Sequence, residues 1–113
     1  MITLEDLKKY GADTEEGLSR CMGMEDFYLK LVNSLPDDAN FDKLKTAIEK
    51  EDANAVFEAS HALKGVLGNL SITPLLGPVT DICERVRGKD EMPEIEDLIP
   101  AYKEALEAFK AIQ

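Results

Sequence analysis

The only histidine of this 113-residue chain, His61, lies within the segment FEASHALKGVLGNL, residues 57–70. Lys64 follows it by three residues, and Gly65 and Gly68 follow it by four and seven. Glycine costs a helix interior about 1 kcal/mol relative to alanine, so two glycines beside one histidine need an explanation. A neutral imidazole is a nucleophile, an ammonium one turn away can offset the charge of a phosphoryl group, and absent side chains leave room for a second protein. This combination favours phosphoryl transfer at His61.

The helical period predicts that His61 faces solvent. When this segment is wound at about 100° per residue, its apolar side chains form one stripe. That stripe consists of Val56, Leu63, Leu67 and Leu70, flanked by Ala59, Ser60 and Val66. His61 falls on the opposite side, together with Gly65 and Gly68. Phe57 and Lys64 stand at the border, and two roles stay open for Phe57: packing at the edge of the core or forming part of a docking patch.

Amphipathic helical patterns separated by short breaks cover the chain, and no segment shows the sustained period of two that is typical of a half-buried strand. The expected helices cover about residues 3–11, 13–23, 24–36, 40–52, 52–70, 73–88 and 94–112. Helices that each carry one apolar stripe can bury it by packing together. We therefore predict an all-α fold, an antiparallel up-and-down four-helix bundle with short additional N-terminal helices, as a single domain over residues 1–113.

Capping patterns predict where several of these helices begin. Thr3 with Asp6, and Asp13 with Glu16, have the spacing of a capping box, in which the third residue after the cap reaches back to it. Asn40 is the expected cap of the fourth helix, because asparagine is among the favoured N-cap residues.

Apolar spacing and prolines predict the limits of three further helices. The third helix is expected to bury a face made of Met24, Phe27, Leu31 and Leu35. In the sixth, Gly77–Pro78 is expected to interrupt the first turns if the helix starts at Pro74. In the last, Pro100 predicts a kink or a restart.

Composition excludes several classes of partner. The chain has a formal net charge of -10 and shows no basic stripe, which disfavours binding to nucleic acid or to an anionic membrane surface. No apolar run approaches the ~20 residues of a membrane span, and the N-terminus lacks a signal-peptide pattern, so we expect a cytoplasmic protein. Cys21 and Cys83 are far apart without CxxC spacing, and we expect two free thiols.

The segment SHALKGVLGNL resembles the core motif of histidine-containing phosphotransfer (HPt) domains, in which a histidine is followed by leucine, lysine and glycine as H-x-L-K-G. The upstream LKTAIEKEDANAVFEAS resembles the helix, acidic turn and new helix that lead into this motif, and the similarity extends from about Met24 to the C-terminus. Two departures affect the next helix junction. Ser71 stands where the family often has glycine, and Pro74 with Gly77–Pro78 falls where the family tends to run one unbroken helix.

The resemblance implies a role for each residue of the motif. His61 would accept and donate a phosphoryl group through Nε2, and Lys64 would lie near that phosphate. Gly65 would clear space for the partner, and Gly68 matches a position that is often small. Phe57 at the apolar border of the docking surface is our own inference.

The resemblance also implies the partners. Donor and acceptor would be aspartates of receiver domains in response regulators or hybrid histidine kinases, which makes the chain a phosphorelay intermediate in two-component signal transduction. The receiver would supply an acidic pocket and Mg²⁺, so we expect no cofactor, metal or nucleotide in this chain. We expect a phosphoryl carrier that is not an enzyme, without autonomous kinase activity, acting as a monomer.

One alternative of a different class stays open, a helical adaptor that docks a signalling partner and carries no phosphate. An adaptor needs an apolar patch but not histidine, lysine and glycine together. Other catalytic classes lack support, because there is no G-x-x-x-x-G-K-[ST] phosphate loop and no second histidine. The basic residues of RVRGKD, Arg85, Arg87 and Lys89, are expected to serve the C-terminus of their helix.

Overall fold

The computed structural model describes residues 1–113 and is all-helical, as predicted. The elements are α1 (Leu4–Tyr10), α2 (Thr14–Arg20), α3 (Glu25–Ser34), a short 3-10 turn (Leu35–Asp37), α4 (Ala39–Glu49), α5 (Ala53–Asn69), α6 (Thr73–Val86) and α7 (Ile99–Ala111). None of these helices has the length and apolar character needed to span a membrane.

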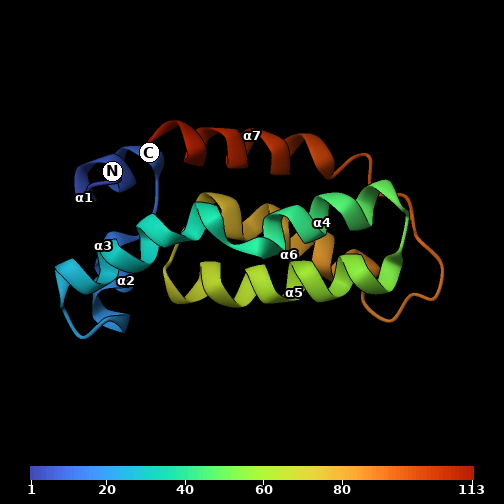
Figure 1. Cartoon of the computed structure of the whole chain (residues 1–113), viewed down its shortest axis with the longest axis horizontal. Coiled ribbons are helices and arrows are strands. Elements are labelled where there is room, and N and C mark those ends of the chain that lie inside the picture. Colours follow the sequence, from blue (N-terminus) through green and yellow to red (C-terminus); the bar gives the residue numbers. More distant parts are fainter.

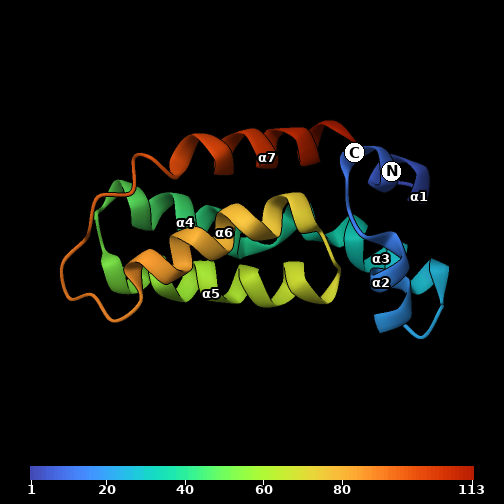
Figure 2. The same cartoon turned by 180° about the vertical axis from the view of Figure 1, so that it is seen from behind.

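The helices α4, α5, α6 and α7 lie side by side, and the chain reverses direction at each connection between them (Figure 1). The N-terminal helices α1, α2 and α3 gather at one end of this assembly (Figure 2). The molecule is accordingly elongated, with extents of 42 × 24 × 19 Å. The expectation that short N-terminal helices cover one end is confirmed.

Apolar residues at helical spacing build the core. On α5 the buried positions are Ala53, Val56, Ala59, Ser60, Leu63 and Leu67. Burying one leucine contributes about 1.5–3 kcal/mol, so this stripe determines which side of α5 faces inward. The buried hydroxyl of Ser60 donates to the backbone carbonyl of Val56 at 2.7 Å, which satisfies it within the helix.

Two of the predicted caps are confirmed and one is wrong. Thr3 and Asp6 form a complete capping box, and the Asp13 side chain accepts a hydrogen bond from the backbone N–H of Glu16. The cap of α4 is Asp38, whose carboxylate accepts from the backbone N–H of Asn40 at 2.8 Å. Both residue types are good caps, and the backbone turn after the 3-10 segment decides between them.

The predicted buried face of α3 is right for Leu35, which is buried, and for Leu31, which packs against the core, but it is wrong for its first two residues. Met24 and Phe27 are 53% and 46% exposed, and Tyr28 and Val32 are buried in their place. The Tyr28 hydroxyl donates to the carbonyl of Leu70 at 2.8 Å, so the ring is buried with its polar end satisfied. Burial also raises the pKa of Tyr28 to about 12.

The prolines neither break α6 nor kink α7. α6 runs without interruption through Pro78, because Gly77 has no Cβ to clash with the proline ring. α7 begins at Ile99 with Pro100 in its first turn, where the missing N–H is not needed. Residues 94–98 are not helical, so the helix expected from residue 94 is neither kinked nor restarted at Pro100 but begins at Ile99.

Hydrogen bonds attach the N-terminal helices to the α5–α6 junction. Tyr28 binds Leu70 as described, the backbone N–H of Asp13 donates to the carbonyl of Ser71 at 3.1 Å, and the Thr73 hydroxyl donates to the carbonyl of Gly11 at 3.0 Å. These contacts hold α2 beside the C-terminal end of α5.

α2 also packs closely on α3. A Cβ added at Gly17 would lie 2.6 Å from the ring of Tyr28, so only glycine fits at this position without a shift of the buried tyrosine. The close approach keeps α2 in one position relative to α3.

Ser71 is strained at the junction between α5 and α6. Its φ is 54°, in the left-handed region, and its buried hydroxyl has no hydrogen-bond partner. We expect Ser71→Gly to raise the free energy of unfolding by about 1 kcal/mol, because relief of strain and of the unpaired hydroxyl outweighs the entropy of glycine. Denaturant unfolding measures the change, with Ser71→Ala as a control that removes only the hydroxyl. An unchanged or lower stability of Ser71→Gly would contradict the strain argument.

Candidate functional site

His61 lies near the middle of α5 and is exposed, as the helical period predicts. The side chain of Asp52 accepts from the backbone N–H of Ala55 and caps the helix, which sets where the following turns begin. The ring of His61 lies against the ring of Phe57, one turn earlier, with centroids 5.4 Å apart and an interplanar angle of 33°. One ring face of His61 is therefore supported by Phe57, and the imidazole is presented outward.

Of the two roles that the sequence left open for Phe57, the structure shows the packing role. It is half-buried and packs against the core cluster, yet its ring also contacts His61. The Arg87 guanidinium lies over the same ring, with Cζ 5.0 Å from the centroid. Phe57 thus connects the core to the surface around the histidine.

Lys64 lies on the same side of the site and is paired with α6. Its Nζ is 3.8 Å from Oε2 of Glu84, and its side chain is 37% exposed. The same Oε2 accepts hydrogen bonds from Nε and Nη2 of Arg87, at 3.0 and 2.8 Å. Glu84 therefore lies between the two cations and holds both near the histidine.

Arg85 lies in the last turn of α6 and Arg87 is its C-cap residue, as expected for basic residues at a helix C-terminus, and each also makes a side-chain contact. Arg87 covers Phe57 and binds Glu84. Arg85 binds the carboxylate of Asp97 at 2.6 Å and fastens the segment before α7. The contact between Arg87 and Phe57 could not be predicted from the sequence, because it depends on how α6 packs on α5.

The two glycines form an open shelf on α5. A Cβ at Gly65 or Gly68 would meet no other atom within 4 Å, so neither glycine is needed for packing inside this chain. The shelf is part of a hollow of about 350 Å³. Its lining consists of Glu16, Arg20, His61, Lys64, Gly65, Gly68, Asn69 and Leu76. The structure thus brings His61, Lys64, Gly65 and Gly68 together and adds Glu16 and Arg20 of α2, which sequence reasoning missed.

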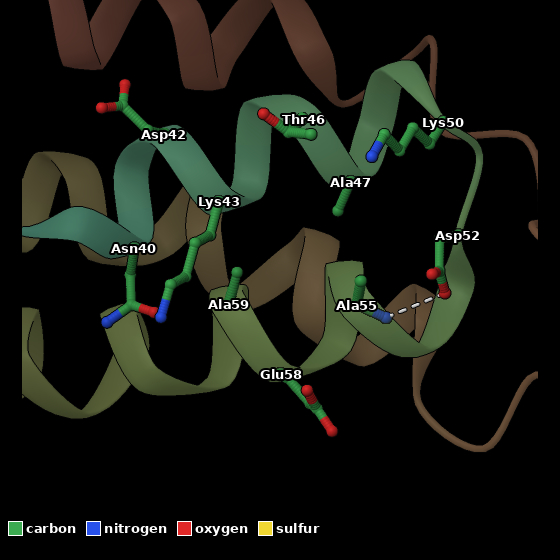
Figure 3. A pocket seen from close by; sticks show the side chains of 10 residues that line it. All are labelled: Asn40, Asp42, Lys43, Thr46, Ala47, Lys50, Asp52, Ala55, Glu58 and Ala59. Atoms are coloured by element: carbon green, nitrogen blue, oxygen red, sulfur yellow. Dashed lines mark hydrogen bonds between the residues drawn. The ribbon is translucent and has the colours of Figure 1, made fainter.

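A second hollow, of about 470 Å³, lies between α4 and α5 and has no nucleophilic side chain of the kind found at His61 (Figure 3). Its ten lining residues include no histidine or cysteine. Figure 3 shows Lys43 and Asn40 reaching toward each other, and Asp52 engaged with the backbone of Ala55. Charges of both signs line it, so it presents no concentrated field to a ligand.

The cysteines do not contribute to the site. Cys21 and Cys83 are both buried and both free, which confirms the expectation of two thiols without a disulfide. Neither residue lines the hollow that contains His61.

Together these features define a class of protein: an all-helical bundle that presents one histidine from the middle of a helix, beside a lysine and an open glycine shelf. A family model for the Hpt domain matches residues 28–112, most of the chain. The chain belongs to the Hpt domain family, whose members are phosphocarriers in two-component signalling and interact with receiver domains. Searches among curated proteins and among solved structures gave no match.

The pair between Glu84 and Arg87 gives a prediction that pH titration can test. The hydrogen bonds from Arg87 hold the pKa of Glu84 below its usual value. The stabilisation that follows is present above the unfolded-state pKa and is lost as the pH falls through the lower folded value. We expect Arg87→Gln to raise the pKa of Glu84 toward its ordinary value, followed by NMR of the side-chain carboxyl. An unchanged midpoint would show that Arg87 is not the cause, and Arg85→Gln, which leaves this pair intact, is the matched control.

Proposed function

We propose that this chain is a phosphorelay intermediate in which His61 accepts a phosphoryl group from a receiver-domain aspartate and passes it to a second receiver. The observation that carries the proposal is the exposed imidazole beside an open shelf on a rigid helix. A nucleophile that must meet a group held by another protein needs this access. In the forward step, a nitrogen lone pair of His61 attacks phosphorus, and the bond from phosphorus to the aspartate oxygen breaks with its electrons on the carboxylate.

The neighbouring residues have distinct proposed roles. Lys64 offsets the negative charge of the phosphoryl group on His61, since its ammonium lies on the same border of α5 and can exchange Glu84 for the phosphate. Gly65 and Gly68 leave space for the receiver, which is supported by the absence of any packing need for them. Phe57 supports the imidazole ring and adds apolar area at the edge of the docking surface.

The proposal extends to the organisation of the chain. Residues 1–113 act as one domain, in which α4–α7 form an antiparallel up-and-down four-helix bundle and the N-terminal helices complete one end. The chain works as a monomer, because a dimer formed through the α5 surface would bury His61. It carries phosphate without a nucleotide or kinase activity of its own, and Mg²⁺ belongs to the partner receiver.

Transfer from phosphorylated receiver domains tests this function directly. Purified chain is mixed with each labelled receiver of the same organism, and the product is examined for a phosphoryl group that is labile in acid and stable in alkali. We expect label on this chain from at least one receiver, and its passage to a second receiver added afterwards. Binding to receivers without any label from a complete panel would contradict phosphotransfer and would support the adaptor alternative.

A further inference from the structure

The hollow around His61 extends beyond the motif to a different helix. From His61 it follows the glycine shelf past Gly65 and Gly68 to Asn69, and its far side is formed by Arg20 and Glu16 of α2. The helical rise from His61 to Asn69 is about 12 Å. Arg20 therefore stands at the far end of the same shelf that leads to the histidine.

Arg20 is placed there by a rigid local structure and keeps free hydrogen-bonding capacity. The junction hydrogen bonds and the close packing of Gly17 on Tyr28 hold α2 beside the end of α5. Nε and Nη2 of Arg20 both bind one oxygen of Glu16, at 3.1 and 3.0 Å, and the side chain is 51% exposed. A guanidinium has five N–H donors, so three of them remain for a partner.

The size of a protein interface makes contact with α2 unavoidable for a partner centred on His61. A specific interface buries about 800 Å² on each side, which corresponds to a patch roughly 30 Å across. The radius of such a patch, about 15 Å, exceeds the distance of about 12 Å from His61 along α5 to the end of the shelf beside α2. The incoming site is also anionic, since it bears an aspartyl phosphate. A chain of net charge -10 needs local cations where such a partner approaches.

The segment that follows Arg20 in the chain exposes several large apolar side chains. Four large apolar side chains in the chain are strongly exposed, and three of them, Met22, Met24 and Phe27, follow Arg20 within seven residues. Exposed apolar area beside polar groups is typical of an interaction surface. This segment and α2 precede residue 28, so they lie outside the part of the chain that matches the family model.

We propose that the receiver domain that exchanges phosphate with His61 also contacts α2, where Arg20 pairs with an acidic side chain of that receiver. This inference rests on the phosphotransfer function proposed above. It makes α2 a determinant of which receivers this chain accepts, in addition to the motif on α5.

Charge reversal with a matched control tests the proposal. Arg20→Glu is compared with Lys9→Glu, which causes the same change in net charge and breaks a similar exposed pair, Lys9 with Glu5, on α1. Each variant is phosphorylated by a receiver and, separately, by phosphoramidate, a donor too small to reach α2. We expect Arg20→Glu to raise KM for the receiver about tenfold, because the lost pair becomes a like-charge contact. The phosphoramidate rate should stay unchanged, and Lys9→Glu should behave as the wild type with both donors.

The outcomes separate this inference from the proposed function. If the wild-type chain takes no phosphate from any receiver, the function itself fails. If the wild type is active and Arg20→Glu shows the KM of Lys9→Glu, the contact with α2 is refuted. A fall in the phosphoramidate rate would also refute it, since Arg20 would then act on His61 and not on the partner. Arg20→Gln, which removes the charge without repulsion from Glu16, should show a smaller rise in KM and guards against misfolding of the reversed variant.

Discussion

We expect His61→Gln to lose all phosphoryl acceptance, from receivers and from phosphoramidate alike, while the fold stays intact. Glutamine is polar and of similar size, but its amide nitrogen has no lone pair available for attack on phosphorus. The side chain is exposed, and substitutions at such positions usually change the free energy of unfolding by no more than about 0.5 kcal/mol. The loss of transfer would therefore report chemistry and not stability.

The measurement combines labelling, binding and thermal unfolding on the same preparation. Receiver binding should persist in His61→Gln, because Phe57, Gly65 and Gly68 still present the docking surface. Asn54→Gln is a suitable control, since Asn54 is another exposed residue of α5 that lies two turns before the histidine and outside the hollow. Acid-labile label on the His61→Gln protein would place the acceptor elsewhere and would overturn the assignment.

The second large effect is expected at Gly65, where stability and transfer should change in opposite directions. Leucine has nearly the helix propensity of alanine, so Gly65→Leu should raise the free energy of unfolding by about 0.5–1 kcal/mol. No clash offsets this increase in the free energy of unfolding, because a Cβ at Gly65 meets no other atom within 4 Å. The same side chain would stand on the shelf next to His61, and it should slow transfer from a receiver by about tenfold or more, since a misplacement of about 1 Å can cost a factor of 100.

Two comparisons make this prediction specific. Phosphoramidate should label Gly65→Leu at nearly the wild-type rate, because a small donor does not need the shelf. Ala108→Leu, an equivalent enlargement at an exposed position of α7, should leave both rates unchanged. If Gly65→Leu is slowed equally with both donors, the glycine serves the histidine itself and the steric explanation is wrong.

The cations around the site are each paired with a carboxylate of this acidic chain. Lys64 and Arg87 are both held near His61 by one carboxylate, Glu84, and Arg20 stands at the other end of the shelf. The pKa of Glu84 is lowered chiefly by Arg87, so the carboxylate keeps its charge and its hold on Lys64 across the neutral range. Lys64 is thereby kept at the site before any phosphate arrives.

Several features were predictable because they depend on one helix alone. His61, Lys64, Gly65 and Gly68 lie within eight residues, and a constant rotation per residue is enough to place them on the surface opposite a leucine stripe. The caps Thr3 and Asp13 were predictable for the same reason, since a cap depends on bonds between residues two or three apart.

Two expectations were wrong because they depend on more than the spacing of apolar residues: the buried face of α3 and the break in α6. On α3, apolar residues cover about half of the helix circumference, which is wider than the buried face. Within that range the buried face was decided by Gly17 of α2 and the carbonyl of Leu70, which accommodate Tyr28. The expected break at Gly77–Pro78 did not occur, because the residue that precedes the proline is the one with no Cβ.

The sequence by itself determined the all-helical class and the exposed histidine with its lysine and glycines, because helical periodicity is local and burial of leucine dominates it. Only the tertiary structure decided which charges surround that histidine. Arg20, Glu84 and Arg87 lie far from His61 in the chain, and the packing of α2 and α6 on α5 places them at the hollow, at Lys64 and at Phe57, respectively. Such contacts depend on how helices pack against one another, and no spacing within one helix encodes them.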